Sequence, residues 1–240
     1  MNQAAAPRMT TVLETIDGGT RYLEKRGEVI PLQHLLGTVW FHNREFKTDA
    51  RALIPRPETE ELAEWILSWD LPETRRVLDM GCGSGVLGLT LAAERPAWDV
   101  TLADVSPDAL ALARENAARL EVGNVRFLES DLFSAVEGEF DGIVANLPYV
   151  PDGESATMAR EVLHDPALAL FSGADGLDLI RRFTPEAFQR LKPGGWLVLE
   201  IGHDQASQVA GILHASSFKA IEVKTDLSGV DRFPFAKRPL

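Results

Sequence analysis

Short apolar runs recur along the chain from Arg76 onward. They are rich in valine, leucine and isoleucine and are bounded by polar or turn-forming residues, a pattern typical of buried β-strands. On this basis we predict strands at Val77–Met80, Val100–Ala103, Val125–Leu128, Gly142–Ala145 and Trp196–Ile201.

Segments with helical spacing lie between several of these runs. The clearest is Ser106–Leu120, where Ser106 can cap a helix and Pro107 suits its first turn. Strands that alternate with helices predict a doubly wound, mostly parallel sheet. Near the C-terminus, two strand-like segments flank a turn at Ser228-Gly229 without a helix between them. We therefore expect an α/β fold with seven strands and an antiparallel hairpin at one edge.

The first 70 residues carry shorter patterns. Residues 1–8 are expected to lack order. The remaining stretches predict a helix, a short helical turn that stops at a glycine, a β-hairpin turning at His42-Asn43, and a helix that begins with proline and acidic residues. In chain order these are Thr10–Arg26, Pro31–Gly37, Thr38–Thr48 and Pro57–Trp69.

Composition narrows the class of protein. Of the 240 residues, 45% are hydrophobic and 25% are charged, as in soluble globular domains. No apolar run is long enough to span a membrane, and no signal peptide is visible. The single cysteine, Cys82, cannot form an intramolecular disulfide, which agrees with a reducing, cytoplasmic location. A net charge of −12 disfavours nucleic acid as a partner, because affinity for phosphates comes largely from Lys and Arg.

A glycine-rich loop follows the first of the predicted parallel strands, in the stretch VLDMGCGSGVLG. Gly81, Gly83 and Gly85 permit backbone conformations that other residues avoid and let a ligand approach closely. The segment GSGVLG also matches the dinucleotide fingerprint G-x-G-x-x-G. However, Asp79 at the end of the strand would repel a pyrophosphate and suits a cationic or amine-bearing ligand. The wider pattern resembles the first motif of S-adenosylmethionine (SAM) methyltransferases.

Acidic residues follow the next two strands. Asp104 lies about 20 residues beyond the glycines, where a carboxylate can accept two hydrogen bonds from ribose hydroxyls. Asp131, after the third strand, could hold an adenine amine. The cofactor-binding residues that we predict from these motifs and their neighbours are Gly81, Cys82, Gly83, Ser84, Gly85, Asp104, Val105, Asp131, Leu132 and Asn146.

The fourth strand ends in Asn146-Leu147-Pro148-Tyr149. Ligands of open α/β sheets bind at the carboxyl ends of the strands, so this segment should lie beside the glycine loop. The Asn146 side chain can accept one hydrogen bond, and Leu147, extended before a proline, can offer its carbonyl oxygen. Two such acceptors suit the two hydrogens of a planar NH₂ group, either an amide or the exocyclic amine of adenine. Tyr149 could pack on that group. We predict these four residues to be catalytic.

Together these motifs resemble the amino-methyltransferases, and the flanks resemble one family among them. The stretches LIPRPETEEL, ALFSGADGLDLIRRF, LVLEIGHDQ and DLSGVDR are similar to those of protein-(glutamine-N5) methyltransferases that modify peptide chain release factors. The resemblance runs from about Pro31 to the C-terminus. It implies SAM as cofactor, Pro57 and Thr59 at the cofactor site, and Asn146–Tyr149 around the glutamine of a Gly-Gly-Gln substrate. We further expect a monomeric cytoplasmic enzyme whose partner is a protein.

Three departures from the family pattern leave alternatives open. Leu147 stands where the family usually has proline, and Asn-Leu-Pro-Tyr is the form found in rRNA adenine dimethyltransferases. Asp165 stands where the family usually has glutamate. Only 30 residues precede Pro31, where the family carries a helical domain that helps to dock its substrate. An adenine-N6 methyltransferase acting on RNA or DNA, and a SAM-binding protein without activity, therefore remain as alternatives.

The chain is accordingly divided into an extension at residues 1–52, with a helix and a β-hairpin, and a SAM-dependent catalytic domain at residues 53–240. No metal site is expected, because the five histidines show no metal-ligand spacing. Cys82 is interpreted as a small residue of the cofactor loop rather than as a nucleophile.

Overall fold

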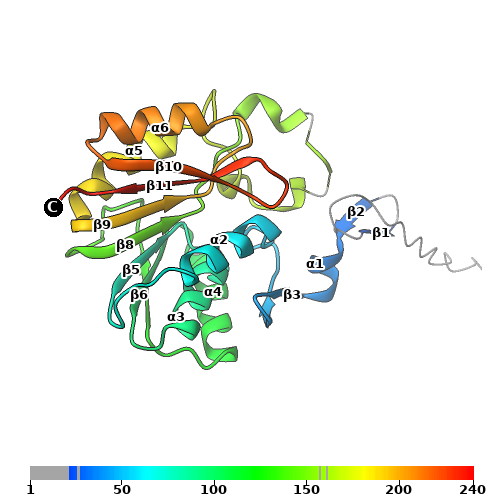
Figure 1. Cartoon of the computed structure of the whole chain (residues 1–240). Coiled ribbons are helices and arrows are strands. Elements are labelled where there is room, and N and C mark those ends of the chain that lie inside the picture. Colours follow the sequence, from blue (N-terminus) through cyan, green and yellow to red (C-terminus); the bar gives the residue numbers. More distant parts are fainter. Residues whose placement is uncertain (1–21, 26–27, 157, 161) are drawn as a thin grey trace, which may run out of the picture.

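The computed structural model describes residues 22–25, 28–156, 158–160 and 162–240, and Figure 1 shows their arrangement. The main sheet has seven strands in the order β10-β11-β9-β8-β5-β6-β7. Strands β5 to β9 run parallel, and β11 pairs antiparallel with both β9 and β10. Their bounds are β5 Arg76–Met80, β6 Asp99–Asp104, β7 Val125–Glu129, β8 Phe140–Ala145, β9 Leu191–Leu199, β10 Lys219–Thr225 and β11 Asp231–Lys237. The predicted sheet and its antiparallel edge hairpin are confirmed.

Helices cover both faces of this sheet, as in a doubly wound fold (Figure 1). On one face α2, α3 and α4 bury residues such as Leu62, Leu89 and Leu110 in one core cluster, and on the other α5 and α6 bury Ile180 and Val209 in a second. The helices are α2 Pro57–Leu67, α3 Val86–Glu94, α4 Pro107–Arg119, α5 Asp178–Arg190 and α6 Ala206–Ala215. No described helix is both long enough and apolar enough to cross a membrane.

Local chemistry explains where α4 and α2 begin. The Ser106 side chain accepts a hydrogen bond from the backbone N–H of Ala109, and Pro107 occupies the first turn, as predicted. Helix α2 starts at Pro57 and carries Glu58 and Glu60 in its first turn, where their charge is favourable to the helix dipole.

The described residues before α2 form two small antiparallel hairpins and one short helix. They are β1 Tyr22–Lys25, β2 Glu28–Pro31, α1 Leu32–Leu36, β3 Thr38–Phe41 and β4 Arg44–Lys47. The short helix, its left-handed glycine stop at Gly37 and the second hairpin are confirmed. The helix predicted over Thr10–Arg26 is wrong at Tyr22–Lys25, which forms a strand paired with Glu28–Pro31. Residues 1–8 and the earlier part of Thr10–Arg26 lie outside the described residues.

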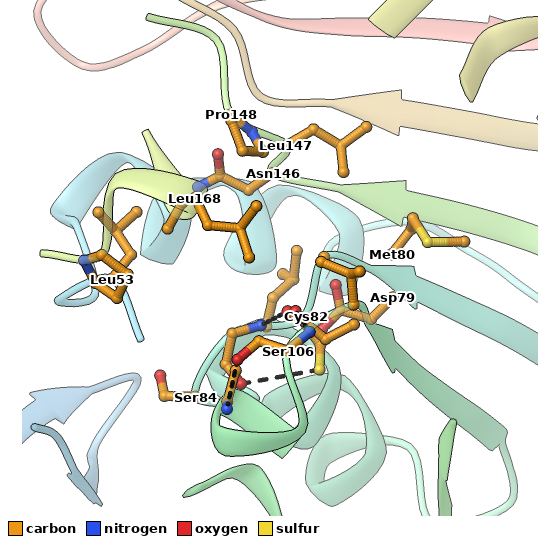
Figure 2. A pocket seen from close by; sticks show the side chains of 18 of the residues that line it. Leu53, Asp79, Met80, Cys82, Ser84, Ser106, Asn146, Leu147, Pro148 and Leu168 are labelled. Carbon is orange, nitrogen blue, oxygen red and sulfur yellow. Dashed lines mark hydrogen bonds between the residues drawn. The ribbon is translucent and has the colours of Figure 1, made fainter. Parts of the chain in front are cut away.

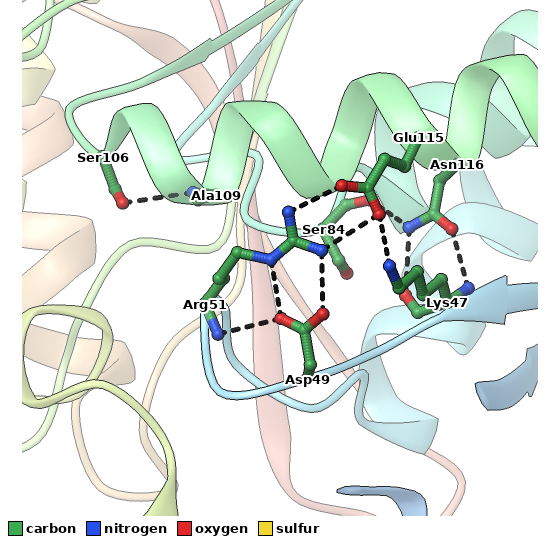
Figure 3. Close-up of polar contacts among 8 residues, drawn as sticks. All are labelled: Lys47, Asp49, Arg51, Ser84, Ser106, Ala109, Glu115 and Asn116. Atoms are coloured by element: carbon green, nitrogen blue, oxygen red, sulfur yellow. Dashed lines mark hydrogen bonds and ion pairs between the residues drawn. The ribbon is translucent and has the colours of Figure 1, made fainter. Parts of the chain in front are cut away.

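The second hairpin is joined to the sheet domain by a buried amide, that of Asn116 on α4 (Figure 3). Its Oδ1 accepts from the Lys47 backbone N–H at 2.7 Å, and its Nδ2 donates to the carbonyl oxygens of Lys47 at 3.1 Å and Ser84 at 2.9 Å. Ser84 belongs to the glycine loop. One side chain therefore connects the hairpin, helix α4 and that loop.

Between β8 and α5 the chain forms three short 3-10 helices, η1 Asp152–Ala156, η2 Val162–His164 and η3 Ala167–Ala169. This segment is held to the residues before α2 through Asp165. The buried Asp165 carboxylate accepts from the Ile54 backbone N–H at 3.0 Å and pairs with Arg56 at 2.6 Å. The aspartate that departs from the family pattern thus keeps a definite anchoring role.

Candidate active site

A cavity of about 360 Å³ lies at the carboxyl ends of β5, β6 and β8. It is the place where ligands bind in open α/β sheets, because chain connections there leave the sheet toward opposite faces. Figure 2 shows Leu53 and Leu168 near Asn146 toward one end of the cavity, with Ser84 and Ser106 toward the other. The lining mixes apolar side chains with a few acids, an arrangement suited to a small polar ligand that also carries an apolar part.

The glycine loop after β5 is tightly folded. Gly81 has φ of 71°, and the backbone N–H groups of Gly81 and Cys82 both donate to the carbonyl oxygen of Ala103. The positive φ favours glycine, and a Cβ atom at Gly81 would lie 3.0 Å from the Leu147 side chain, which would have to shift to make room. Leu147 is 4% exposed, and its side chain packs against this loop. The residue that departs from the family pattern therefore fills space beside Gly81.

Asp104 fastens the loop from β6. One carboxylate oxygen accepts from the Gly83 backbone N–H at 2.8 Å, and the other accepts from the Ser106 backbone N–H at 2.9 Å. Burial raises the pKa of this carboxyl, while the backbone hydrogen bonds act in the opposite direction. A carboxylate has about four lone-pair sites, so Asp104, which lines the cavity, can accept further hydrogen bonds. The carboxylate can therefore both order the loop and accept hydrogen bonds from a diol.

Asp79, at the end of β5, is a second acid in the cavity wall. Its side chain is buried and accepts from the Gly88 backbone N–H of α3 at 2.8 Å. Burial, together with the nearby Asp104, raises the pKa of Asp79 to about 7, while the hydrogen bond from the Gly88 N–H acts in the opposite direction. Because two acids without a paired cation repel each other here, the site favours a ligand that brings positive charge.

Asn146 follows β8 and lines the cavity. Its Nδ2 donates to the hydroxyl of Thr59 at 3.1 Å, and this hydroxyl donates to the Glu200 carboxyl at 2.7 Å. No donor in the described part of the chain reaches the Asn146 Oδ1 atom or the Leu147 carbonyl oxygen. Two hydrogen-bond acceptors are thus available beside the glycine loop, and their predicted role toward a substrate NH₂ group stays a prediction.

The other predicted site residues divide into two groups. Thr59, Val105, Leu132, Leu147 and Pro148 line the cavity, together with the loop residues from Gly81 to Ser84. Three predicted residues are not part of the lining: Pro57, Gly85 and Tyr149.

Each of these three has a structural place of its own. Pro57 begins α2, and Gly85 is the left-handed residue at the start of α3. The carbonyl oxygen of Tyr149 accepts from Gln205 Nε2 at 2.8 Å, and burial raises the pKa of the Tyr149 phenol, which therefore stays protonated.

Asp131 lines the cavity but faces a partner that the sequence did not suggest. Its carboxylate pairs with Arg182 of α5 at 3.1 Å. The other two arginines in the lining are paired in the same way, Arg51 with Asp49 at 2.8 Å and Arg56 with Asp165 at 2.6 Å. The cavity rim therefore does not present a basic face of the kind that tracks a phosphate backbone.

Sequence reasoning missed Glu200 and most of the apolar lining. Glu200 is an acid inside the otherwise apolar stretch LVLEIG, at the carboxyl end of the strand next to β8, and that position was a usable signal. Leu168 and Leu179 gave no signal, because single leucines in η3 and α5 cannot be told from core residues by pattern.

One group of possible metal ligands occurs among the described residues, away from the cavity. His42, Glu60 and Glu64 bring ligand atoms within 4.8 Å of one another. The backbone N–H of His42 donates to Glu60 at 2.7 Å, and the His42 ring approaches Glu94 at 3.5 Å. These contacts hold His42 beside Glu60 and Glu94, and the expectation of no metal stays a prediction.

The strand order, the glycine loop after the first parallel strand and the acid after the second define a class I SAM-dependent methyltransferase fold. Residues 61–175 match the Methyltransferase small domain family. Among solved structures, the chain is similar to a 16S rRNA N2 methyltransferase of T. thermophilus in complex with AdoMet and guanosine. The TM-score is 0.60 at 21% identity, and the match covers 84% of this chain and 49% of that one. At this identity the likeness establishes the fold alone.

Curated relatives place the chain more narrowly. It is 46% identical to the release factor glutamine methyltransferase of Deinococcus radiodurans over 221 residues, which are 90% of this chain and 77% of the relative. It is 39% identical to the ribosomal protein uL3 glutamine methyltransferase of Xanthomonas campestris pv. campestris, over 85% of this chain and 67% of that relative. The chain belongs to the release factor glutamine methyltransferase family.

Proposed function

We propose that this protein transfers a methyl group from SAM to the side-chain amide nitrogen, N5, of a glutamine, and that the substrate is the Gly-Gly-Gln loop of a peptide chain release factor. The observation that carries the proposal is the pair of available acceptors, Asn146 Oδ1 and the Leu147 carbonyl oxygen, beside the glycine-loop cavity. Family membership supports the same reaction. The activity belongs to translation termination, which takes place in the cytoplasm.

The residues of the cavity fit SAM as cofactor. Asp104 offers lone pairs for ribose hydroxyls, and the acidic wall formed with Asp79 suits a ligand bearing a sulfonium and an amine. Leu53, Val105 and Leu168 supply apolar surface. When bound, SAM would supply a methyl group on positively charged sulfur with a neutral thioether as its leaving group, and the proton released by the methylated amide nitrogen would pass to water.

The main role of the protein is to orient the glutamine amide nitrogen, which is a weak nucleophile. An amide lone pair is delocalised into its carbonyl, so the nitrogen must be held in line, about 3–3.5 Å from the carbon it attacks. With one N–H donated to Asn146 Oδ1 and the other to the Leu147 carbonyl, the nitrogen is fixed in direction. Both acceptors carry partial negative charge and favour the positive charge that develops on nitrogen. Proline after Leu147 keeps that carbonyl from joining a helix.

The charge of the molecule supports a protein substrate over RNA. The net charge is −12, and the arginines that line the cavity are paired with aspartates. A loop presenting a single glutamine needs no phosphate track, whereas adenine within a nucleic acid needs one.

The test is methyl transfer with isotopically labelled SAM. Purified release factor, ribosomal protein uL3 and ribosomal RNA are incubated separately with the protein, and the label is located by mass spectrometry. We expect label on the glutamine of the Gly-Gly-Gln loop, and loss of nearly all transfer in Asn146→Ala with the fold retained. Label on uL3 alone would redirect the glutamine activity to that substrate, and label on adenine would overturn the glutamine assignment.

A further inference from the structure

Behind the two acceptors lies a buried acid that the cavity itself does not use. Glu200 directly follows β9, is 2% exposed and is not among the residues lining the cavity. Its carboxyl accepts a hydrogen bond from the Thr59 hydroxyl at 2.7 Å, and that hydroxyl in turn accepts from the Asn146 side chain at 3.1 Å. A buried charge is costly unless it is paired, so its retention here calls for an explanation.

When Glu200 is ionised, the donor and acceptor pattern of this chain allows one orientation of Asn146. A carboxylate can only accept, so the Thr59 hydroxyl gives its hydrogen to Glu200 and accepts from Asn146, and only the NH₂ end of that side chain can donate. The Oδ1 end is then turned toward the cavity. If Glu200 were absent, Thr59 could donate to Asn146 instead, and the amide could rotate by half a turn and present donors to the substrate.

We propose that Glu200 is a positioning residue for methyl transfer, which acts through Thr59 to hold Asn146 Oδ1 toward the substrate amide and places negative charge behind it. This inference rests on the proposed function. A chain of hydrogen bonds that ends in a carboxylate polarises each member, so Asn146 Oδ1 becomes a stronger acceptor. It then favours the positive charge that develops on the attacked nitrogen.

The surroundings of Glu200 leave its charge largely uncompensated. The charged and titratable groups that act on it are Glu58 on α2, Tyr149 after β8 and Arg232 on β11. Arg232 is engaged elsewhere, since its Nη1 donates to the Ile201 carbonyl at 2.9 Å and its Nε lies 3.4 Å from Asp226. Burial raises the pKa of Glu200 to about 7, and the hydrogen bond from Thr59 opposes this shift. The charge behind Asn146 therefore appears as pH rises through neutrality.

The first measurement does not depend on turnover. In protein labelled with ¹⁵N-asparagine, the side-chain NH₂ resonance of Asn146 is identified by its loss in Asn146→Asp and followed across pH. We expect it to shift with a midpoint near 7, the pKa of Glu200. The shift should vanish in Glu200→Gln and persist in the control Glu58→Gln, which removes a neighbouring charge without touching Asn146. An Asn146 resonance whose chemical shift does not change with pH, or still titrates in Glu200→Gln, would overturn the inference.

The second measurement is the rate of transfer to a release factor. We expect Glu200→Gln to lower kcat by about 10- to 100-fold, to leave the KM for SAM nearly unchanged and to abolish the rise of kcat with pH. Thr59→Ser should keep most of the rate and Thr59→Val should lose it. Native rates and pH profile in Glu200→Gln would overturn the inference. If the native protein methylates no glutamine while the Asn146 resonance still follows Glu200, the proposed function fails and the positioning of Asn146 is supported.

Discussion

At the residue scale, the three carboxylates in and behind the cavity wall have different roles because their hydrogen-bond partners differ. Asp104 lines the cavity and accepts from the Gly83 N–H, and Asp79 accepts from the Gly88 N–H of α3. Glu200 accepts from the Thr59 hydroxyl outside the cavity lining. Burial raises the pKa of all three. Substitutions of Asp104 and of Glu200 test two of these roles.

Replacing Asp104 tests the cofactor assignment. Asp104→Ala should weaken SAM binding by about 1–3 kcal/mol, because charge-assisted hydrogen bonds to the ligand and two bonds that order the loop are lost. Isothermal titration calorimetry measures the change. Asp108→Asn, at an exposed position in the first turn of α4, removes one charge without touching the cavity and serves as the control. Equal SAM affinity in Asp104→Ala and the native protein would contradict the assignment.

Glu200 should also affect stability in a pH-dependent way. Its pKa is raised from 4.5 to about 7 in the folded state, so ionisation favours the unfolded chain. The stability that the protonated acid provides is present below its unfolded pKa and is lost as pH rises through about 7. In Glu200→Gln the glutamine side chain does not ionise, so the variant does not lose this stability as pH rises. From about pH 5 to about pH 8, the free energy of unfolding should shift in favour of the variant by roughly 2–3 kcal/mol. Denaturant titrations of both proteins measure it, and parallel pH curves would refute the expectation.

At the scale of elements, the hairpin β3–β4 depends on one amide in α4. Asn116→Leu keeps similar volume but leaves the backbone groups of Lys47 and the Ser84 carbonyl without their partner. We expect a loss of about 2–4 kcal/mol in the free energy of unfolding, since buried polar groups become unsatisfied. Chemical denaturation measures this loss.

The neighbouring Glu115 provides a matched control for that substitution. Its carboxylate pairs with Lys47 and Arg51 at the surface, close to Asn116 (Figure 3). Because solvent screens exposed ion pairs, Glu115→Gln should leave stability nearly unchanged. If both variants lose stability equally, the hairpin is held by the surface charges and not by the buried amide.

The elements also show how far the sequence predicts this structure. Helix α4 and the strands β5 to β8 follow from a serine cap, a proline and continuous apolar runs, which are local signals. The strand Tyr22–Lys25 was missed because a short run of mixed polarity does not distinguish a strand from a helix. At the site, glycines, Asp104 and Asn146 stand at strand ends and were predicted. Glu200 also stands at a strand end and was overlooked, whereas Arg182 could not be predicted because its role depends on its contact with the distant Asp131.

At the scale of the whole molecule, charge decides between two substrates. Transfer to a glutamine-bearing loop involves few phosphate contacts, so its rate should change by less than about tenfold between low and moderate salt. Proteins that neutralise many phosphates lose about a thousandfold or more in affinity over the same range. Transfer rates measured with release factor and with RNA across a salt series test this point. A steep loss with salt, accompanied by label on RNA, would favour the adenine alternative.

The cavity described above is lined by stretches that range from Arg51 to Arg182 and that meet only in the complete sheet. A ligand seated there can bind only when all of them are in place, so mass action makes it a stabiliser of the entire domain. Free SAM at a hundred times its dissociation constant should add about 2.7 kcal/mol to the free energy of unfolding. Differential scanning calorimetry should then show a single melting transition that moves upward as a whole. In a cell, the supply of methyl donor would thereby influence how long each copy of the protein survives proteolysis.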